Sequence, residues 1–156
     1  MRGRVKTVAD PAVVRSLVDR LTALSPDRQR RWGTLSAHEM LCHLGDATDM
    51  VLRIRPRNSP VPLRRRRMVK LIGLWAPFRW PHGWKTNPQH DPRVDGTRPS
   101  QFARDLKRAI AGIEGIAVAD PTALDPAHGF FGTMSLIDWQ RWTYKHTDHH
   151  LRQFGG

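Results

Sequence analysis

Two histidines in the C-terminal stretch, residues 135–156, have a spacing suited to holding a metal ion. His146 and His150 are four positions apart, so in a helix both imidazoles lie on one face, about one turn from each other. Imidazole nitrogens are common ligands of zinc and related divalent metals. The pair alone is a weak signal, because such a spacing arises readily by chance among 8 histidines in 156 residues. Two half-buried histidines that hydrogen-bond to neighbouring groups are the alternative.

A third histidine, His43, belongs to the apolar face of an earlier helix. The residues that form this face at helical steps of three and four are Met40, His43, Ala47 and Met50. Helices that share a core can bring such side chains together, and a shared ion removes the cost of burying unpaired imidazoles. We therefore predict that the ring nitrogens of His43, His146 and His150 converge on one divalent ion, Zn, Ni or Fe. Three protein ligands would leave a position open for water or substrate.

Four further side chains lie close to these histidines in the sequence. His149 is interpreted as a solvent-edge residue, with a role in supporting the metal ligands or contacting a substrate as the alternative. Glu39 and Asp46 both lie within about a turn of His43, near enough to orient its second ring nitrogen. Glu39 suits a capping box, so Asp46 is the preferred partner. Cys42 lies about 100° around the helix from His43 and is not expected to be a ligand.

Helix-start and helix-end signals define the elements that must position these residues. The expected helices span residues 11–24, 37–52, 63–75, 101–115 and 136–154. Side-chain oxygens that can cap a helix precede four of them, at Asp10, Ser36, Ser100 and Ser135. Four arginines at the start of the helix over residues 63–75 oppose the helix dipole, so the sequence does not fix where this helix begins.

The connections between these helices are long and irregular. Residues 77–99 contain five prolines and are expected to form a crossover. Trp80 and Trp84 in this segment either roof a pocket or only anchor the loop. Alternating strand patterns are almost absent, and 156 residues suit one domain. The sequence therefore predicts an all-α protein, a four-helix bundle with long crossover connections, as a single domain over residues 1–156.

The chain is strongly basic, with 26 Lys and Arg against 14 Asp and Glu and a formal net charge of +12. The four consecutive arginines are Arg64, Arg65, Arg66 and Arg67. They precede an apolar and aromatic run, residues 68–80, and this pattern could lie on nucleic acid or an anionic membrane surface. No groove-reading motif accompanies them, and a solvated face is the usual role of such a run. Polyanion binding through these arginines is the alternative function.

The cysteine content and the apolar runs bear on the compartment. Cys42 is the only cysteine, which excludes an intramolecular disulfide and favours a reducing environment. The N-terminus has no apolar stretch of signal-peptide length, and the longest apolar run, residues 71–78, is too short to span a bilayer. These observations lead us to expect a cytoplasmic protein.

Two motifs resemble the DinB/YfiT-like superfamily. They are WGTLSAHEMLCHLGDA, residues 32–47, and GFFGTMSLIDWQRWTYKHTDHHLRQFG, residues 129–155. The similarity is greatest to a branch described only as a domain of unknown function. The resemblance implies a four-helix bundle in which one histidine of the second helix and an H-x-x-x-H pair of the last helix hold a divalent metal. By position, these ligands are His43, His146 and His150.

The resemblance also implies a reaction. Members of the superfamily include S-transferases that use bacillithiol or mycothiol, and a mycothiol-dependent isomerase. The implied mechanism is Lewis-acid catalysis, in which the metal deprotonates a low-molecular-weight thiol and the thiolate attacks an electrophile. Relatives often form homodimers. The alternatives are a metal-dependent hydrolase and a metal site that stabilises the fold without catalysis.

Overall fold

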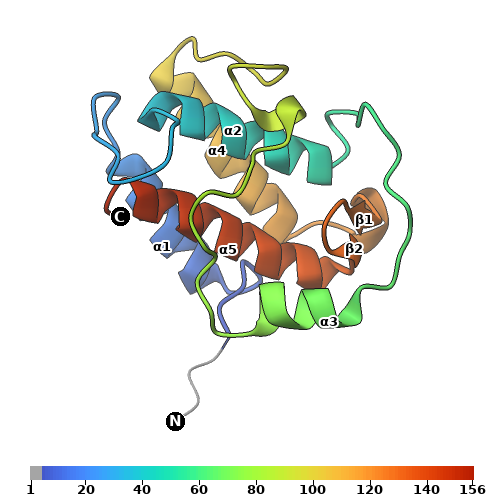
Figure 1. Ribbon diagram of the computed structural model, residues 1–156. Coiled ribbons are helices and arrows are strands. Elements are labelled where there is room, and N and C mark those ends of the chain that lie inside the picture. The colour runs from blue at the N-terminus through green and yellow to red at the C-terminus, as the bar shows by residue number, and fades with distance from the viewer. Residues whose placement is uncertain (1–4) are drawn as a thin grey trace.

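The computed structural model describes residues 5–156, which are mostly helical, as the all-α prediction requires (Figure 1). The α-helices of this part of the chain are α1 (Pro11–Thr22), α2 (Ala37–Val51), α3 (Arg67–Lys70), α4 (Phe102–Ala117) and α5 (Leu136–Gln153). The shorter elements are a π-helix, η1 (Leu71–Trp75), two 3₁₀ turns, η2 (Pro88–His90) and η3 (Pro121–Ala123), and an antiparallel hairpin of β1 (Ala127–His128) and β2 (Gly132–Thr133). Within residues 5–156, no helix is long and apolar enough to cross a membrane.

Three helices begin at the capping residues that the sequence predicts. Asp10 caps α1 through its side chain. At α2 the Ser36 hydroxyl accepts the N–H of Glu39, and the Glu39 carboxylate accepts the N–H of Ser36. Ser135 and Asp138 form the same reciprocal pair at the start of α5. These caps satisfy N–H groups that a helix start otherwise leaves unpaired.

The prediction that Ser100 caps the fourth helix is wrong. Gln101 is the N-cap residue of α4, and its side chain makes no capping hydrogen bond. The backbone N–H of Ser100 donates to the Asp105 carboxylate at 3.1 Å, and the Ser100 hydroxyl is engaged by Arg104. The Asp105 carboxylate in the first turn therefore binds the N–H of Ser100, and α4 begins without a side-chain cap.

The third helix is shorter than the predicted span, residues 63–75. Its α-helical turn begins at Arg67 and passes into η1. Arg65 forms an isolated antiparallel bridge with Gly132 of β2 instead. Only one of the four arginines therefore lies in the helix, which limits the unfavourable interaction of cations with the positive end of the helix dipole.

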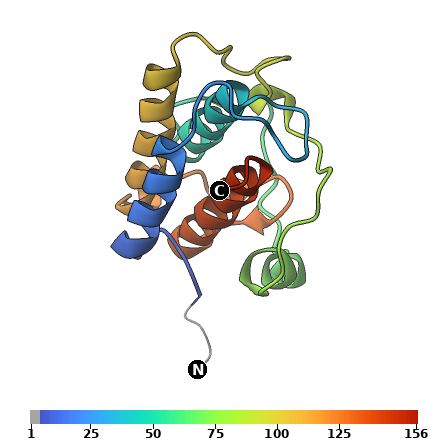
Figure 2. The same ribbon diagram turned by 90° about the vertical axis from the view of Figure 1, so that its left-hand side faces the viewer.

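Four helices, α1, α2, α4 and α5, lie against one another (Figure 1). They contribute most of the aliphatic and aromatic side chains of the core. Both α4 and α5 contact α1 and α2, and they contact each other. Side chains with almost no exposure in this core include Leu21, Met40, Leu41, Ile113, Trp139 and Phe154. The helices α2 and α4 approach closely at Gly112, where an added Cβ would clash with the Thr48 hydroxyl. Helix α3 and η1 lie on the other side of α5 from α1 and α4 (Figure 2).

Residues 77–99 form the long irregular crossover that their proline content predicts. Arg93 of this segment donates two hydrogen bonds, of 2.8 and 2.7 Å, to the Glu39 carboxylate, and this pairing lowers the pKa of Glu39 to about 2. Thr97 donates its N–H and its hydroxyl to Asp46 at 2.6 Å each. These contacts hold the crossover against α2, the helix that carries His43.

Candidate metal centre

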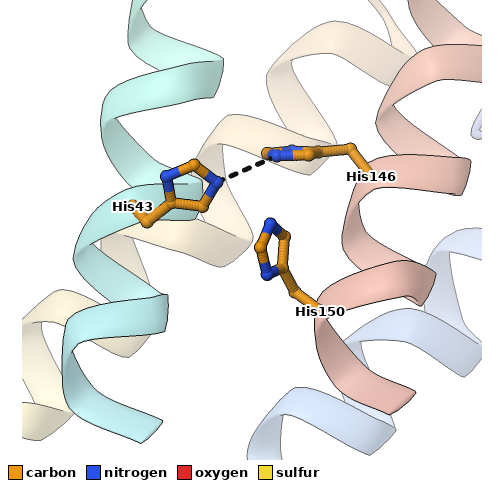
Figure 3. Close-up of side chains that lie close together, drawn as sticks. All are labelled: His43, His146 and His150. Carbon is orange, nitrogen blue, oxygen red and sulfur yellow. Dashed lines mark hydrogen bonds between the residues drawn. The ribbon is translucent and has the colours of Figure 1, made fainter. Parts of the chain in front are cut away.

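Three histidine rings meet between α2 and α5 (Figure 3). His43 projects from α2, and His146 and His150 project from α5. Nε2 of His43 lies 3.0 Å from Nε2 of His146, and one ring nitrogen from each of the three lies within 4.8 Å of the others. The three residues are between 4% and 9% exposed. The ring nitrogens of His43, His146 and His150 therefore converge, as the helical spacing in the sequence predicts.

In two of these rings, a hydrogen bond at Nδ1 fixes the tautomer that leaves the Nε2 lone pair free to bind a metal. Nδ1 of His43 lies 2.9 Å from the backbone carbonyl oxygen of His90, and Nδ1 of His150 lies 2.7 Å from Oε1 of Gln153. Both oxygens can only accept, so each Nδ1 carries the proton and donates. The lone pair of each neutral ring is then on Nε2, and an oxygen partner on the other nitrogen raises its basicity as a ligand.

Burial keeps the three imidazoles in their neutral form. Desolvation lowers the pKa of His43, although the His90 carbonyl opposes the shift. Desolvation also lowers the pKa of His146 and of His150 well below the usual value, and the neighbouring histidines add to both shifts. Because a protonated imidazole cannot coordinate a cation, these shifts favour the ligand form near neutral pH.

The arrangement fits a divalent metal ion. Two nitrogens on one tetrahedral ion, each about 2.0–2.1 Å from it, stand about 3.3 Å apart. The Nε2 atoms of His43 and His146 are 3.0 Å apart, close to that separation. Trp142 stacks on the His146 ring at 4.4 Å between centroids and so fixes its plane. A three-nitrogen donor set accepts Zn, Ni or Fe and does not select one of them.

The three histidines line a cavity of about 1040 Å³ whose wall includes several large aromatic side chains. The aromatic side chains in this wall include Trp32, Trp80, Trp84, Phe130, Phe131 and Trp142. Trp80 and Trp84 stack in parallel with centroids 5.9 Å apart, and Nε1 of Trp80 also donates to the carbonyl of Gly73 at 2.7 Å. The sequence left two roles open for these tryptophans, lining a pocket and anchoring the loop. Trp80 has both roles.

His149 also lines the cavity, and its interpretation as a solvent-edge residue is wrong. The residue is only 7% exposed, because Trp32 packs edge-on against its ring with centroids 4.9 Å apart. Burial lowers the pKa of His149 to about 4, so the ring is neutral at pH 7. Within residues 5–156, its buried Nδ1 has no hydrogen-bond partner. An unpaired buried nitrogen is costly, which makes it a natural contact for a bound molecule.

Asp46 does not orient His43, contrary to the sequence prediction. Its carboxylate accepts hydrogen bonds from Thr97, from Arg108 at 2.6 Å and from Arg55 at 3.2 Å. These partners, and Thr97 and Arg108 above all, hold the pKa of Asp46 below its usual value despite its burial. Asp46 therefore fastens the crossover and α4 to α2, and the His90 carbonyl takes the position beside His43.

Two residues at the centre were missed by the sequence analysis. His90 contributes a backbone carbonyl from the irregular crossover, and a main-chain group has no sequence signature. Gln153 contributes its side-chain oxygen to His150 from the last turn of α5. Its position three residues after His150 was a usable signal, because residues three apart share a helix face.

A second group of potential ligands, His38, Cys42 and Asp105, lies between α2 and α4. Nε2 of His38 is 2.8 Å and Sγ of Cys42 is 3.6 Å from the same carboxylate oxygen of Asp105. Burial raises the pKa of the Cys42 thiol to about 12, and the Asp105 charge adds to the shift. Cys42 is thus a protonated hydrogen-bond donor, and it belongs to this cluster and not to the centre at His43.

The four consecutive arginines lie apart from the cavity lining. Arg64, Arg65 and Arg67 are exposed, whereas Arg66 is half-buried and donates to the backbone carbonyl of Phe130 at 3.2 Å. Their binding to a polyanion stays a prediction.

Comparisons of the chain with family models, curated proteins and solved structures gave no match. The resemblance to DinB/YfiT-like proteins therefore rests on the two sequence motifs. The candidate metal centre has separate support, because the burial and convergence of His43, His146 and His150, and the tautomers of His43 and His150, are properties of this chain.

Proposed function

We propose that this chain is a DinB/YfiT-like four-helix bundle that holds one divalent ion, Zn, Ni or Fe, and transfers a low-molecular-weight thiol to an electrophile. The observation that carries the proposal is the convergence of three buried, neutral imidazoles in the wall of a cavity. The two motifs that resemble the superfamily supply the choice of thiol chemistry. The protein would bind a small-molecule thiol and a small-molecule electrophile. The resemblance also implies that the protein forms a homodimer.

The ligand count and the cavity favour catalysis over a structural role. Structural zinc sites are usually closed by four protein ligands, whereas catalytic sites keep one position for water or substrate. The group at His43 offers three ligands within the described part of the chain. The adjoining volume of about 1040 Å³ lies at the upper end of the range for small-molecule sites. An ion bound here would act as a Lewis acid that lowers the pKa of a coordinating thiol.

The chain's own residues would position the reactants. His149 offers a neutral, unpaired Nδ1 beside the three ligands and is proposed to accept a hydrogen bond from the substrate. Trp80 and Trp84 provide parallel apolar surfaces against which a flat or apolar electrophile can pack.

The proposal is tested with protein purified without an affinity tag and loaded with Zn, Ni or Fe(II) in turn. Consumption of cysteine, glutathione, bacillithiol or mycothiol is followed in the presence of monochlorobimane and a panel of other electrophiles. We expect one loaded form to accelerate thiol consumption, and the acceleration to disappear in a His146→Ala/His150→Ala variant. A His149→Phe variant should keep the metal and lose most of the turnover.

Two outcomes would contradict the proposed transferase activity. Stoichiometric metal with no thiol consumption across the panel would leave a structural metal site. Turnover of esters or amides without thiol would instead identify a hydrolase at the same three histidines.

A further inference from the structure

The segment between α2 and the end of the crossover has an extreme charge bias. From residue 50 to residue 90 the sequence contains ten Lys and Arg residues and no Asp or Glu. Three of these cations have acidic partners elsewhere in the chain, because Arg55 pairs with Asp46, Arg57 with Asp125 and Lys70 with Asp138. Six others are exposed and, within residues 5–156, form no ion pair: Arg53, Arg64, Arg65, Arg67, Arg79 and Lys85.

Helix α3 and η1 present apolar side chains on both faces. The inward face packs Leu74, which has no exposure, against the rest of the molecule. Asp138 of α5 anchors this segment by accepting from Lys70 Nζ at 2.7 Å and from Trp75 Nε1 at 3.0 Å. The outward face is also apolar, with Met68 66%, Leu71 55% and Ile72 56% exposed.

Such an arrangement is uncommon for a surface helix. A helix on the surface of a globular protein usually presents charged or polar residues to water. Met68, Leu71 and Ile72 lie at helical spacing on one side, and Phe78, which is 68% exposed, lies three residues after the end of η1. Contiguous apolar groups rimmed by polar ones mark an interaction surface. The segment also lies at the periphery, on the outer side of α5 (Figure 2).

We propose that the outward face of α3 and η1, together with the arginines that flank it, binds an anionic lipid surface. Interfacial helices combine these two features, because apolar side chains enter the acyl boundary while Lys and Arg contact anionic headgroups. The charge complementarity comes from four of these unpaired cations, Arg64, Arg65, Arg67 and Arg79, and the apolar contact comes from Met68, Leu71, Ile72 and Phe78. The proposal does not depend on the function of the three-histidine centre.

Two other occupants fit the surface less well. Nucleic acid would contact the cations through its phosphates. It would leave the exposed apolar side chains of Met68, Leu71 and Ile72 without a binding partner. A second copy of the chain, docked by a two-fold axis, would bring the same cationic patch against itself. Neither Asp nor Glu occurs within residues 50–90 to compensate that repulsion.

The test is flotation of the full chain with vesicles in a density gradient. One set of vesicles contains equal parts of phosphatidylglycerol and phosphatidylcholine, and the other contains phosphatidylcholine alone. We expect the protein to float with the anionic vesicles only, and less so at high salt. An Arg64→Gln/Arg65→Gln/Arg67→Gln variant should partition on the order of 100-fold more weakly, because each basic residue near an anionic surface contributes roughly fivefold.

A second variant tests the apolar contact. Met68→Ser/Leu71→Ser/Ile72→Ser should weaken partitioning by roughly tenfold or more, and Ile72→Ser alone provides a milder change should the triple variant melt early. The matched control is Arg104→Gln/Val94→Ser/Val118→Ser, which removes an exposed cation and two apolar side chains, 57% and 86% exposed, from other surfaces. This control should float like the parent.

Three outcomes would overturn the proposal. The first is no flotation with anionic vesicles, and the second is equal binding to the uncharged vesicles. The third is unchanged anionic binding by the serine variant, because the arginines would then act as a general polyanion site, as for nucleic acid. Sedimentation velocity covers the remaining case, since a parent dimer that the serine variant converts to a monomer would assign the face to self-association.

Discussion

His150 donates its Nδ1 proton to Oε1 of Gln153, 2.7 Å away and one turn further along α5. Because Nδ1 carries the proton, the lone pair of His150 is on Nε2, the nitrogen available to the three-histidine centre. The carbonyl of His90 does the same for His43 at 2.9 Å. The centre is therefore already oriented by a side chain of the last helical turn and a main-chain group of the crossover.

Replacement of Gln153 by leucine is expected to weaken metal binding by roughly 10- to 100-fold, because His150 loses the acceptor that fixes its tautomer. The affinity is measured by competition with a chromophoric chelator. Gln140→Leu is the matched control, since Gln140 is a buried glutamine of the same helix that donates to Ala117 and does not contact the centre. Equal affinities in the two variants would remove the orienting role of Gln153.

The His146→Ala/His150→Ala variant is expected to contain no metal, whereas the parent, purified without a tag, contains close to one ion per chain. Elemental analysis measures both. His82→Ala serves as the control, because His82 is exposed and stacks on Trp32 outside the group of three. Absence of metal from the parent, with an unchanged melting temperature in the variant, would return the three histidines to ordinary core residues.

The sequence predicted the convergence of the three histidines because each lies on a helix whose start and rotation are encoded locally. Ser36 and Ser135 fix the helix starts, and steps of three and four residues fix which side chains turn inward. The orienting groups were beyond the same reasoning. The His90 carbonyl comes from a segment without periodicity, and Asp46 was misassigned because its actual partners, Thr97 and Arg108, are 51 and 62 residues away.

The predictions that were wrong concern features that depend on contacts with residues far away in the chain. The start of the third helix depends on the pairing of Arg65 with Gly132, which lies far along the chain. His149 was assigned to solvent because the burial of its ring depends on Trp32, which precedes α2 in the chain. Local patterns cannot anticipate such contacts.

The stability of the protein is expected to fall as the pH falls from 6.5 to about 4, in part through His128. Burial lowers the pKa of His128 from 6.5 to about 4, and its Nδ1 accepts the N–H groups of Phe130 and Phe131. Between these pH values the unfolded chain binds a proton that the folded chain does not, so the free energy of unfolding decreases as the pH falls. The slope from one group is at most about 1.4 kcal/mol per pH unit.

Urea unfolding of the parent and a His128→Gln variant at several pH values within this window measures the contribution. Because the other buried histidines are common to both proteins, the difference in slope isolates His128. Parallel pH profiles would show that His128 does not contribute.

Substitution of Gly112 by alanine is expected to lower the free energy of unfolding by roughly 1–3 kcal/mol, because the new methyl group would overlap the Thr48 side chain between α2 and α4. Thr48→Ala in the same chain should relieve part of that loss, so the two changes are not additive. Gly129→Ala is the control, since a Cβ at Gly129 meets nothing within 4 Å. Both are measured by urea unfolding at neutral pH, and a fully additive double variant would contradict the overlap.

The histidines that α2 and α5 contribute to the centre lie far apart along the chain, with His43 and His146 separated by 103 residues. An ion shared by them is a reversible cross-link that closes a loop comprising most of the polypeptide. Such a closure removes conformational entropy from the unfolded chain, as a disulfide of similar span would. In a protein whose single cysteine excludes an internal disulfide, the metal supply would then set thermal stability, and the melting temperature would rise with the concentration of free ion.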